Sequence, residues 1–234
     1  GEDPHANSLV DTHCGCPYSG IMKENPEGLI VALTGASGMP YARRLLQILC
    51  KKGIQVHLSI SEAAFLVIRE ELGLKLDINN PDLEALVGRD VRSIWYHKVT
   101  QLDAPIASGS FPIRGMVIIP CSMNTLAAVA NGLASNLIQR AASVTLKEDR
   151  RLILVPRETP LNTINLENML KVARAGAHLI PAMPGFYHHP KTVEDLVDFM
   201  VARVLDSLQI GHDLLVPYEG PAQSSRQQTV DSSQ

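Results

Sequence analysis

The chain has 234 residues, 45% of them hydrophobic, enough for one large α/β domain or two small ones with a full apolar core. Its formal net charge of −3, its 4% aromatic content and the lack of a basic stripe argue against a nucleic-acid surface. No apolar run reaches the ~18 residues of a membrane span and no signal-peptide pattern occurs, so we expect no membrane association and a cytoplasmic location.

Residues 1–27 mix Gly, Pro, Asn, Ser and His without periodicity, which predicts a flexible or partner-docked N-terminal extension. Within it, His13, Cys14 and Cys16 could act as metal ligands. A structural zinc site draws its ligands from paired Cys/His knuckles, and no second knuckle follows, so we favour an arm without a metal. Cys50 in a helical pattern and Cys121 at a strand end suit buried or site-lining thiols better than disulfides.

The first strand signal is the continuous apolar run at residues 29–34, typical of a strand covered on both faces. The turn Gly35-Ala36-Ser37-Gly38 follows, and then an amphipathic helical pattern through Lys52. Glycines let the backbone approach a ligand, and a helix N-terminus favours an anion. The turn lacks the full Gly-x-Gly-x-x-Gly fingerprint, so a mononucleotide is favoured over a dinucleotide, and a plain tight turn is the alternative.

A second strand is predicted at residues 56–60, before a helix at residues 63–72. Ser61 lies between them, where its hydroxyl could cap the helix or contact a phosphate. Glu70 and Glu71 stand near the helix C-terminus, an unfavourable place for acids, which suggests that one of them serves another purpose.

The signal is weaker from Gly73 to Gln101. We expect a short helix at residues 83–87 and a strand near residues 94–96. The small, turn-rich stretch at residues 104–110 suits a loop lying against a flat ligand, and an ordinary surface loop is the alternative.

Two strand ends in the middle of the chain predict a binding site. The apolar strand at residues 115–121 passes into small polar residues before a helix at residues 126–134. The strand at residues 152–155 is closed by Pro156-Arg157-Glu158-Thr159-Pro160. Charge at the end of a buried strand is not needed for folding. Because ligands of open α/β sheets bind beyond the carboxyl ends of the strands, both turns predict one site.

The rest of the chain continues the alternation of helices and strands. We expect helices at residues 136–146 and 166–175, a short strand within residues 178–184, an aromatic and imidazole loop, and a helix from Thr192 through Leu208. The pattern predicts a single-domain Rossmann-like (flavodoxin-like) α/β fold, a doubly wound parallel sheet with helices on both faces. It would occupy residues 28–216, followed by a disordered C-terminal tail at 217–234.

Six motifs in collinear order resemble those of the flavin prenyltransferases, the UbiX family. They span most of the chain that we expect to be ordered, which makes chance agreement remote. The motifs are Thr34-Gly-Ala-Ser-Gly38, Pro120-Cys-Ser-Met-Asn-Thr-Leu126, Asn136-Leu-Ile-Gln-Arg-Ala-Ala142, Leu154-Val-Pro-Arg-Glu-Thr-Pro160, Leu166-Glu-Asn-Met-Leu170 and Pro184-Gly-Phe-Tyr-His188.

The resemblance implies an activity, a cofactor and partners. Such enzymes resemble the flavoprotein cysteine decarboxylases in fold and FMN placement, but they join a dimethylallyl group to N5 and C6 of reduced FMN. The donor is dimethylallyl monophosphate, or in some members the diphosphate. The product, prenylated FMN, serves a partner decarboxylase of the UbiD type. The resemblance also implies a homo-oligomer, with twelve chains as a candidate size.

The resemblance further implies roles for particular residues. Ser37, Glu71 and Glu158 would take part in catalysis, with Glu158 acting at the phosphate and Glu71 beside the dimethylallyl group and the flavin. Arg140, Lys147, Tyr187 and Arg203 would bind the allylic phosphate. The FMN-binding residues would be Gly35, Ala36, Ser37, Ser61, Ser122, Met123, Asn124, Thr125 and Arg157.

Two positions depart from the family pattern. Tyr218 stands where the family has a C-terminal Trp that helps to close the site. Leu102 stands where an aromatic residue often precedes Ala104-Pro105. These departures bear on lid closure, on the shape of the prenyl pocket and on the choice between monophosphate and diphosphate.

Elementary chemistry agrees with these roles. Lys147, Arg203 and Tyr187 offer a leaving phosphate a point charge, a bidentate fork and a phenolic donor. Such fixed cations can take the part that Mg²⁺ plays in many prenyl-diphosphate enzymes, so no metal is expected. Glu158 could protonate the phosphate if burial raised its pKa, although Arg157 opposes this, and Ser37 or Glu71 could relay the proton lost from C6.

The alternatives stay open at this point. Arg203 could merely pair with Asp206 or Glu194, and Lys147 could be a solvated helix end. An FMN-dependent decarboxylase of a cysteinyl carboxylate would share the sheet and flavin site, but it should carry a catalytic His on the helix after the second strand, and here that helix has none. A non-catalytic flavin carrier is the third reading.

Overall fold

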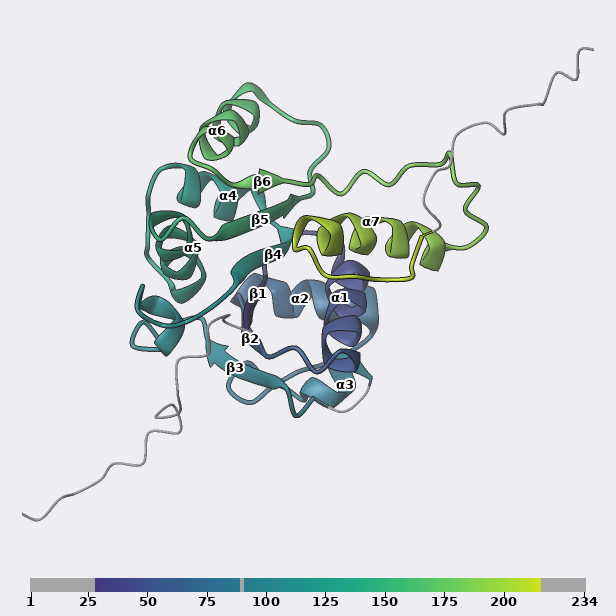
Figure 1. Ribbon diagram of the computed structural model, residues 1–234, viewed down its shortest axis with the longest axis horizontal. Coiled ribbons are helices and arrows are strands. Elements are labelled where there is room, and N and C mark those ends of the chain that lie inside the picture. Colours follow the sequence, from purple (N-terminus) through teal and green to yellow (C-terminus); the bar gives the residue numbers. More distant parts are fainter. Residues whose placement is uncertain (1–27, 89–90, 216–234) are drawn as a thin grey trace, which may run out of the picture.

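The computed structural model describes residues 28–88 and 91–215 and shows one parallel sheet of six strands in the order β3-β2-β1-β4-β5-β6 (Figure 1). Because β1 and β4 are neighbours at the centre, the chain winds outward from them in both directions. The strand order therefore reverses between β1 and β4, which is where doubly wound sheets bind ligands. The strands are β1 Leu29–Leu33, β2 Val56–Ile60, β3 Ile94–Lys98, β4 Gly115–Cys121, β5 Arg151–Pro156 and β6 His178–Leu179.

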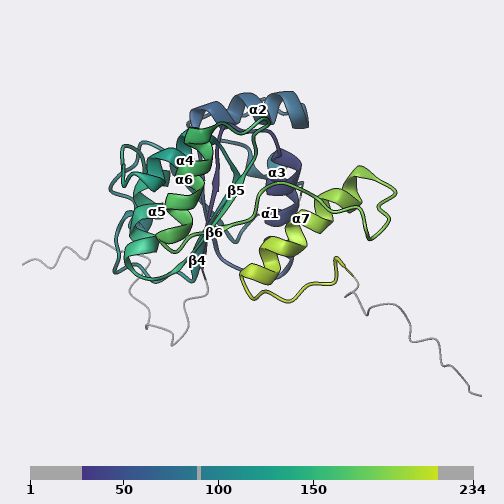
Figure 2. The same ribbon diagram turned by 90° about the horizontal axis from the view of Figure 1, so that it is seen from above.

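Helices cover both faces of the sheet, as predicted (Figure 2). On one face lie α1 Met39–Lys51, α2 Glu62–Leu72, α3 Leu83–Val87 and α7 Val193–Ser207. On the other lie α4 Met123–Ala130, α5 Leu137–Lys147 and α6 Thr163–Arg174, with the short 3-10 helix η1 Pro105–Ala107. The α7 helix follows β6 but packs against α1, so the end of the chain returns to the first face.

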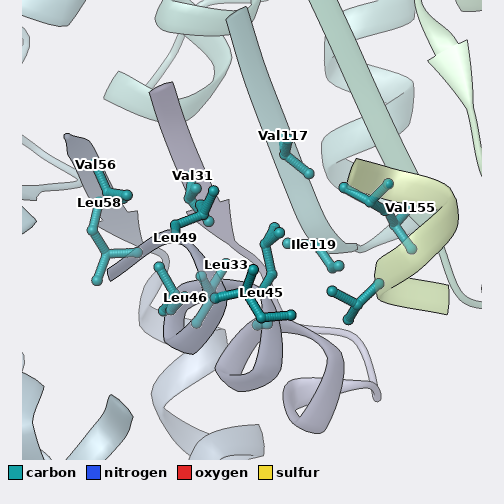
Figure 3. Close-up of a cluster of buried hydrophobic side chains, with 14 of the residues drawn as sticks. Val31, Leu33, Leu45, Leu46, Leu49, Val56, Leu58, Val117, Ile119 and Val155 are labelled. Carbon is teal, nitrogen blue, oxygen red and sulfur yellow. The ribbon is translucent and has the colours of Figure 1, made fainter. Parts of the chain in front are cut away.

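The strand residues alternate between two apolar cores. Val31, Val117 and Val155 point to the α1 face, where Leu45, Leu46 and Leu49 meet them (Figure 3). Their sequence neighbours Ile30, Ile118 and Leu154 point to the α5 face. Since the central strands β1 and β4 are buried on both sides, their sequences are continuously apolar and show no alternation with polar residues.

Several boundaries differ from those predicted. The α4 helix begins at Met123, three residues before the predicted Leu126, because Ser122 caps it, and it ends at Ala130 before Gly132, whose φ is +69°. The α6 helix begins at Thr163, three residues before the predicted start at residue 166, because Asn162 supplies the cap. The last strand has only two residues, and Pro181 follows it closely with no N–H to donate.

Some predictions fall outside the described residues. These are the N-terminal extension at 1–27 with His13, Cys14 and Cys16, and the tail at 217–234 with Tyr218. Within the described ranges, none of the helices has both the length and the apolar character that a membrane crossing requires.

Candidate functional site

Three turns at the carboxyl edge of the sheet are joined by hydrogen bonds around Thr34. The Thr34 hydroxyl donates to the carbonyl oxygen of Pro120 over 2.9 Å and accepts from the Ser122 N–H over 2.7 Å. The Arg157 N–H donates to the carbonyl of Cys121 over 3.4 Å. The turns after β1, β4 and β5 therefore form one connected floor at the point where the strand order reverses.

The turn after β1 also touches the start of α2. A Cβ atom on Gly35 would lie 2.5 Å from the Cβ of Ala63, so only glycine allows this approach. The Ser61 N–H donates to the carbonyl of Leu33 over 3.0 Å, and the Ser61 hydroxyl caps α2 by accepting from the Ala64 N–H. Ser61 thus belongs to the same floor as Gly35, Ala36 and Ser37.

The N-terminus of α1 is capped by an acid from another helix. The Glu71 carboxylate accepts from the Gly38 N–H over 3.0 Å and from the Met39 N–H over 2.8 Å. Gly38 has a φ of +123° and no side chain to cap the helix. The misplaced acid at the end of α2 is explained by this contact, because Glu71 neutralises the positive end of α1, while Glu70 pairs with Arg69.

The N-terminus of α4 is another positive helix end on this floor. Its first turn contains no acid. The Ser122 hydroxyl accepts from the Thr125 N–H and donates to the Thr125 hydroxyl over 3.0 Å. Met123 and Asn124 follow directly, and Asn124 is exposed. Backbone N–H groups and hydroxyls at a helix start suit a phosphate, so this end can take the anion that Glu71 excludes from α1.

Cys121 lies beneath this floor and is fully buried. Burial raises the pKa of its thiol to about 12, while a hydrogen bond from the Leu126 backbone opposes the rise. The thiol therefore stays protonated at neutral pH, and it packs in the apolar core beneath the floor.

Arg157 and Glu158 extend from the floor toward solvent. Both side chains are exposed in the single chain. The Glu158 carboxylate accepts from the Thr159 N–H over 3.0 Å, which bends it back onto its own turn. Neither residue is desolvated by its own chain, so the burial that an acid role for Glu158 would need has to come from elsewhere.

Arg140 and Lys147 both lie on α5, Arg140 one turn from its start and Lys147 at its last residue. The α5 helix begins beside the carboxyl end of β3, where the Leu137 N–H donates to the carbonyl of Val99, and it ends where β5 begins. Lys147 therefore stands at the opposite edge of the sheet from Arg157, separated by the length of β5, about 20 Å at 3.3 Å per residue. Arg140 donates from Nε to the carbonyl of Ala107, and Lys147 pairs with Glu148.

Tyr187 and Arg203 share a third location, a groove of about 620 Å³ on α7 and the loop before it. The Tyr187 side chain is 68% exposed and its ring meets that of Phe199 edge-on. Arg203 forms an ion pair with Asp206 over 2.9 Å, which is one of the two pairings that the sequence left open as an alternative to phosphate binding. His188 stacks on Phe199, and both of its ring nitrogens are buried without a hydrogen-bond partner.

One chain thus brings together the predicted flavin residues and Glu71, but not the predicted phosphate residues. Sequence reasoning missed two contributors and one contact: Thr34, which joins the turns; Glu148, the partner of Lys147; and the N–H of Gly38, which a positive φ places toward Glu71. A threonine at the end of an apolar strand was the available signal for the first. Among residues 28–88 and 91–215, no group of three His, Cys, Asp or Glu side chains could hold a metal.

Comparison with known proteins agrees with this arrangement. The family model described as Flavoprotein matches residues 19–205. A flavin prenyltransferase UbiX from Halalkalibacterium halodurans is 52% identical over 184 residues, which cover 79% of this chain and 89% of the relative. The chain belongs to the UbiX flavin prenyltransferase family.

Solved structures of UbiX proteins share the fold. AnUbiX (PadA1), crystallised in complex with FMN and dimethylallyl pyrophosphate, has a TM-score of 0.75 at 38% identity, covering 84% of this chain and 99% of that one. A dodecameric FMN-dependent UbiX-like decarboxylase from Escherichia coli O157:H7 has a TM-score of 0.73 at 43% identity, covering 82% and 100%. The predicted family and fold are confirmed.

Proposed function

We propose that this flavin prenyltransferase joins a dimethylallyl group from dimethylallyl monophosphate to N5 and C6 of reduced FMN. The observation that carries the proposal is the hydrogen-bonded floor around Thr34, which ends at an acid-free helix start on α4. In the reaction the C–O bond to phosphate breaks, C1 of the prenyl group takes the place of the proton on N5, a proton adds to C2 of the alkene, and C3 takes the place of the proton on C6. Reduced FMN supplies the electron-rich atoms that take up the allylic carbons.

The residues of the floor fit a flavin mononucleotide. Gly35 leaves space for a close approach of the backbone, and the start of α4 offers N–H groups and hydroxyls to a phosphate. Ser61 and Arg157 border the same floor and would add a hydroxyl and a cation. The proposed FMN set is therefore Gly35, Ala36, Ser37, Ser61, Ser122, Met123, Asn124, Thr125 and Arg157.

Ser37 and Glu71 are the two candidates for accepting the proton that leaves C6, and the contacts of Glu71 favour Ser37. Both Glu71 oxygens already accept backbone N–H groups, and this arrangement favours the carboxylate as an acceptor that fixes the turn carrying Ser37. Ser37 precedes Gly38 on that turn. We therefore assign the proton relay to Ser37 and the placement of its turn to Glu71.

The allylic phosphate would be bound by Arg140, Lys147, Tyr187 and Arg203, with Glu158 assisting its departure. Because these residues occupy separate locations in one chain, we propose that several copies of the chain complete each site. The dodecameric relative supports such an assembly for this family. A neighbouring copy would also bury Arg157 and Glu158, and burial is the condition under which Glu158 could act as an acid.

The remaining assignments are also proposals. Residues 28–216 would form the enzyme domain, and the product would pass to a UbiD-type decarboxylase. A cytoplasmic location stays a prediction, which fractionation of cells that express the chain would test.

The decisive experiment incubates the protein with reduced FMN and dimethylallyl monophosphate, or with the diphosphate in a parallel arm. Mass spectrometry should then show a flavin heavier by one C5 unit. A flavin of unchanged mass with both donors would contradict the proposal. If a peptide with a C-terminal cysteine instead lost carbon dioxide, the cysteinyl-carboxylate decarboxylase would be favoured, and binding of FMN without either reaction would favour a flavin carrier.

A further inference from the structure

The C-terminal end of α5 has a fixed backbone that presents polar side chains. The Glu148 N–H donates to the carbonyl of Val144 over 3.0 Å, and the Arg150 N–H donates to that of Thr145 over 2.9 Å. Between them, Asp149 has a φ of +53°, which turns the chain sharply from the helix toward β5. Lys147, Glu148 and Arg150 therefore project from a closed helix end and not from a free loop.

The loop at residues 107–111 lies along α5 and is held by arginines at both ends of the helix. Arg150 donates from Nη2 to the carbonyl of Gly109 over 2.7 Å and from Nη1 to that of Phe111 over 2.9 Å. One turn from the start of α5, Arg140 donates to the carbonyl of Ala107. A guanidinium that binds two carbonyls fixes direction as well as distance, so the loop backbone is held beside the end of the helix.

Gly109 is the point where this loop meets the Lys147–Glu148 pair. A Cβ atom on Gly109 would lie 2.8 Å from Cδ of Glu148 and 3.0 Å from Nζ of Lys147. Its φ is not among the positive values of the described glycines. The backbone would therefore accept alanine, and glycine is needed here for the space that the two side chains occupy.

Glu148 holds the Lys147 ammonium group in an ion pair. Hydrogen bonding and charge from Lys147 lower the pKa of the Glu148 carboxyl, which keeps it ionised at neutral pH. A lysine has a long, flexible aliphatic chain that must become ordered when its ammonium group binds a ligand. An ion-pair partner that orders this chain before the ligand arrives reduces the entropy lost on binding.

We propose that Glu148, Gly109 and Arg150 are positioning residues for the phosphate of the allylic donor, an inference that rests on the proposed function. Glu148 orients the Lys147 ammonium group, Arg150 holds residues 109–111 against this pair, and Gly109 leaves the space in which the pair sits. The donor phosphate then meets a lysine that is already in place.

The test compares steady-state kinetics of Glu148→Gln and Gly109→Ala with those of wild-type protein. Each substitution should raise KM for dimethylallyl monophosphate about threefold to tenfold and leave kcat within about twofold of wild type. The reason is that the Lys147 side chain would then lose its conformational freedom only when the donor binds. Glu148→Asp keeps the charge and should recover part of the loss. The melting temperature and FMN content should match wild type, because the displaced atoms are flexible side-chain ends.

Glu70→Gln is the matched control, since Glu70 also pairs with the preceding residue on an exposed helix end. Its KM should equal that of wild type. Calorimetric binding of dimethylallyl monophosphate to the FMN-loaded protein gives a second readout without turnover. A KM and Kd for Glu148→Gln at or below the wild-type values would overturn the positioning role, because the carboxylate would then be a bystander or a competitor of the phosphate.

The same binding measurement separates this inference from the proposed function. If wild-type protein binds the donor but forms no prenylated flavin, the proposed function fails, and weaker binding by Glu148→Gln would still support the positioning role. Wild-type protein that binds no donor would overturn both.

Discussion

At the scale of single residues, hydrogen bonds between distant parts of the chain decide what the site can hold. Thr34 and Ser122 are 88 positions apart and joined by one hydrogen bond. Glu71 reaches the start of α1 from the end of α2. These contacts occupy one positive helix end with a carboxylate and leave another, on α4, for a ligand anion. The residues thereby select where a phosphate can bind.

A buried pair of histidines is neutral in the core of this protein because burial disfavours their charged form. His57 on β2 and His97 on β3 lie 3.0 Å apart between Nδ1 and Nε2, and both are almost fully buried. Burial, together with the neighbouring His97, lowers the pKa of His57 to about 4, and burial also lowers the pKa of His97. The pair is therefore neutral in the folded protein at neutral pH, with one ring donating and the other accepting.

This pair predicts a loss of stability in mild acid. The folded pKa lies below the unfolded value of 6.5, so unfolded protein binds protons first as the pH falls below that value. Each histidine should then lower the free energy of unfolding by at most about 1.4 kcal/mol per pH unit, down to its folded pKa. Thermal melts of wild type and His57→Gln at pH 7.5 and 5.0 would check this, and the variant should lose less on acidification. Equal losses would remove the pair as the cause.

At the scale of elements, caps determine where the helices begin and which side chains they carry. Ser61, Ser122, Asn136 and Asn162 each accept an N–H from the first turn of their helix. Thr192 and Asp195 form a capping box on α7, at the helix start that the sequence predicted. The α7 helix carries Arg203 and packs against α1, so its start helps to set the position of that arginine.

Removal of this cap should be measurable. Thr192→Ala should lower the stability of the fold by ~1 kcal/mol and the melting temperature by about 2–4 °C, because an N–H of the first turn loses its acceptor. Thr163→Ala is the control, since Thr163 is exposed at the first position of α6, where Asn162 provides the cap. Differential scanning calorimetry of both variants would test this, and equal melting temperatures would contradict it.

At the scale of the whole molecule, the proposed site is divided among three locations. The flavin floor lies at the carboxyl edge of the sheet, Lys147 at the amino edge, and Tyr187 with Arg203 in the groove on α7. The apolar side chains of Met183, Phe186 and Val193 are exposed, and in the sequence they lie on either side of residues 187–191, which line that groove. A second copy that covered them would bury this apolar surface.

Subunit complementation follows from this division. Arg157→Ala and Lys147→Ala proteins should each be nearly inactive, whereas co-expression of the two should restore about a quarter of the wild-type activity if each site takes these residues from different copies at random. Formation of prenylated flavin by the purified mixed oligomer would be the measurement. Mixed protein as inactive as its parents would show that both residues must come from the same chain.

The sequence by itself determined the α/β class, the parallel sheet and the convergence of the turns after β4 and β5. It could do so because apolar runs and caps are local signals, and the carboxyl ends of parallel strands share one edge of the sheet. Only the tertiary structure showed that Glu71 caps α1, that Arg150 holds the loop beside Lys147, and that Lys147 lies at the other edge from Arg157. Such contacts join residues that are far apart in the sequence, so they depend on how the helices pack on the sheet, which no local pattern records.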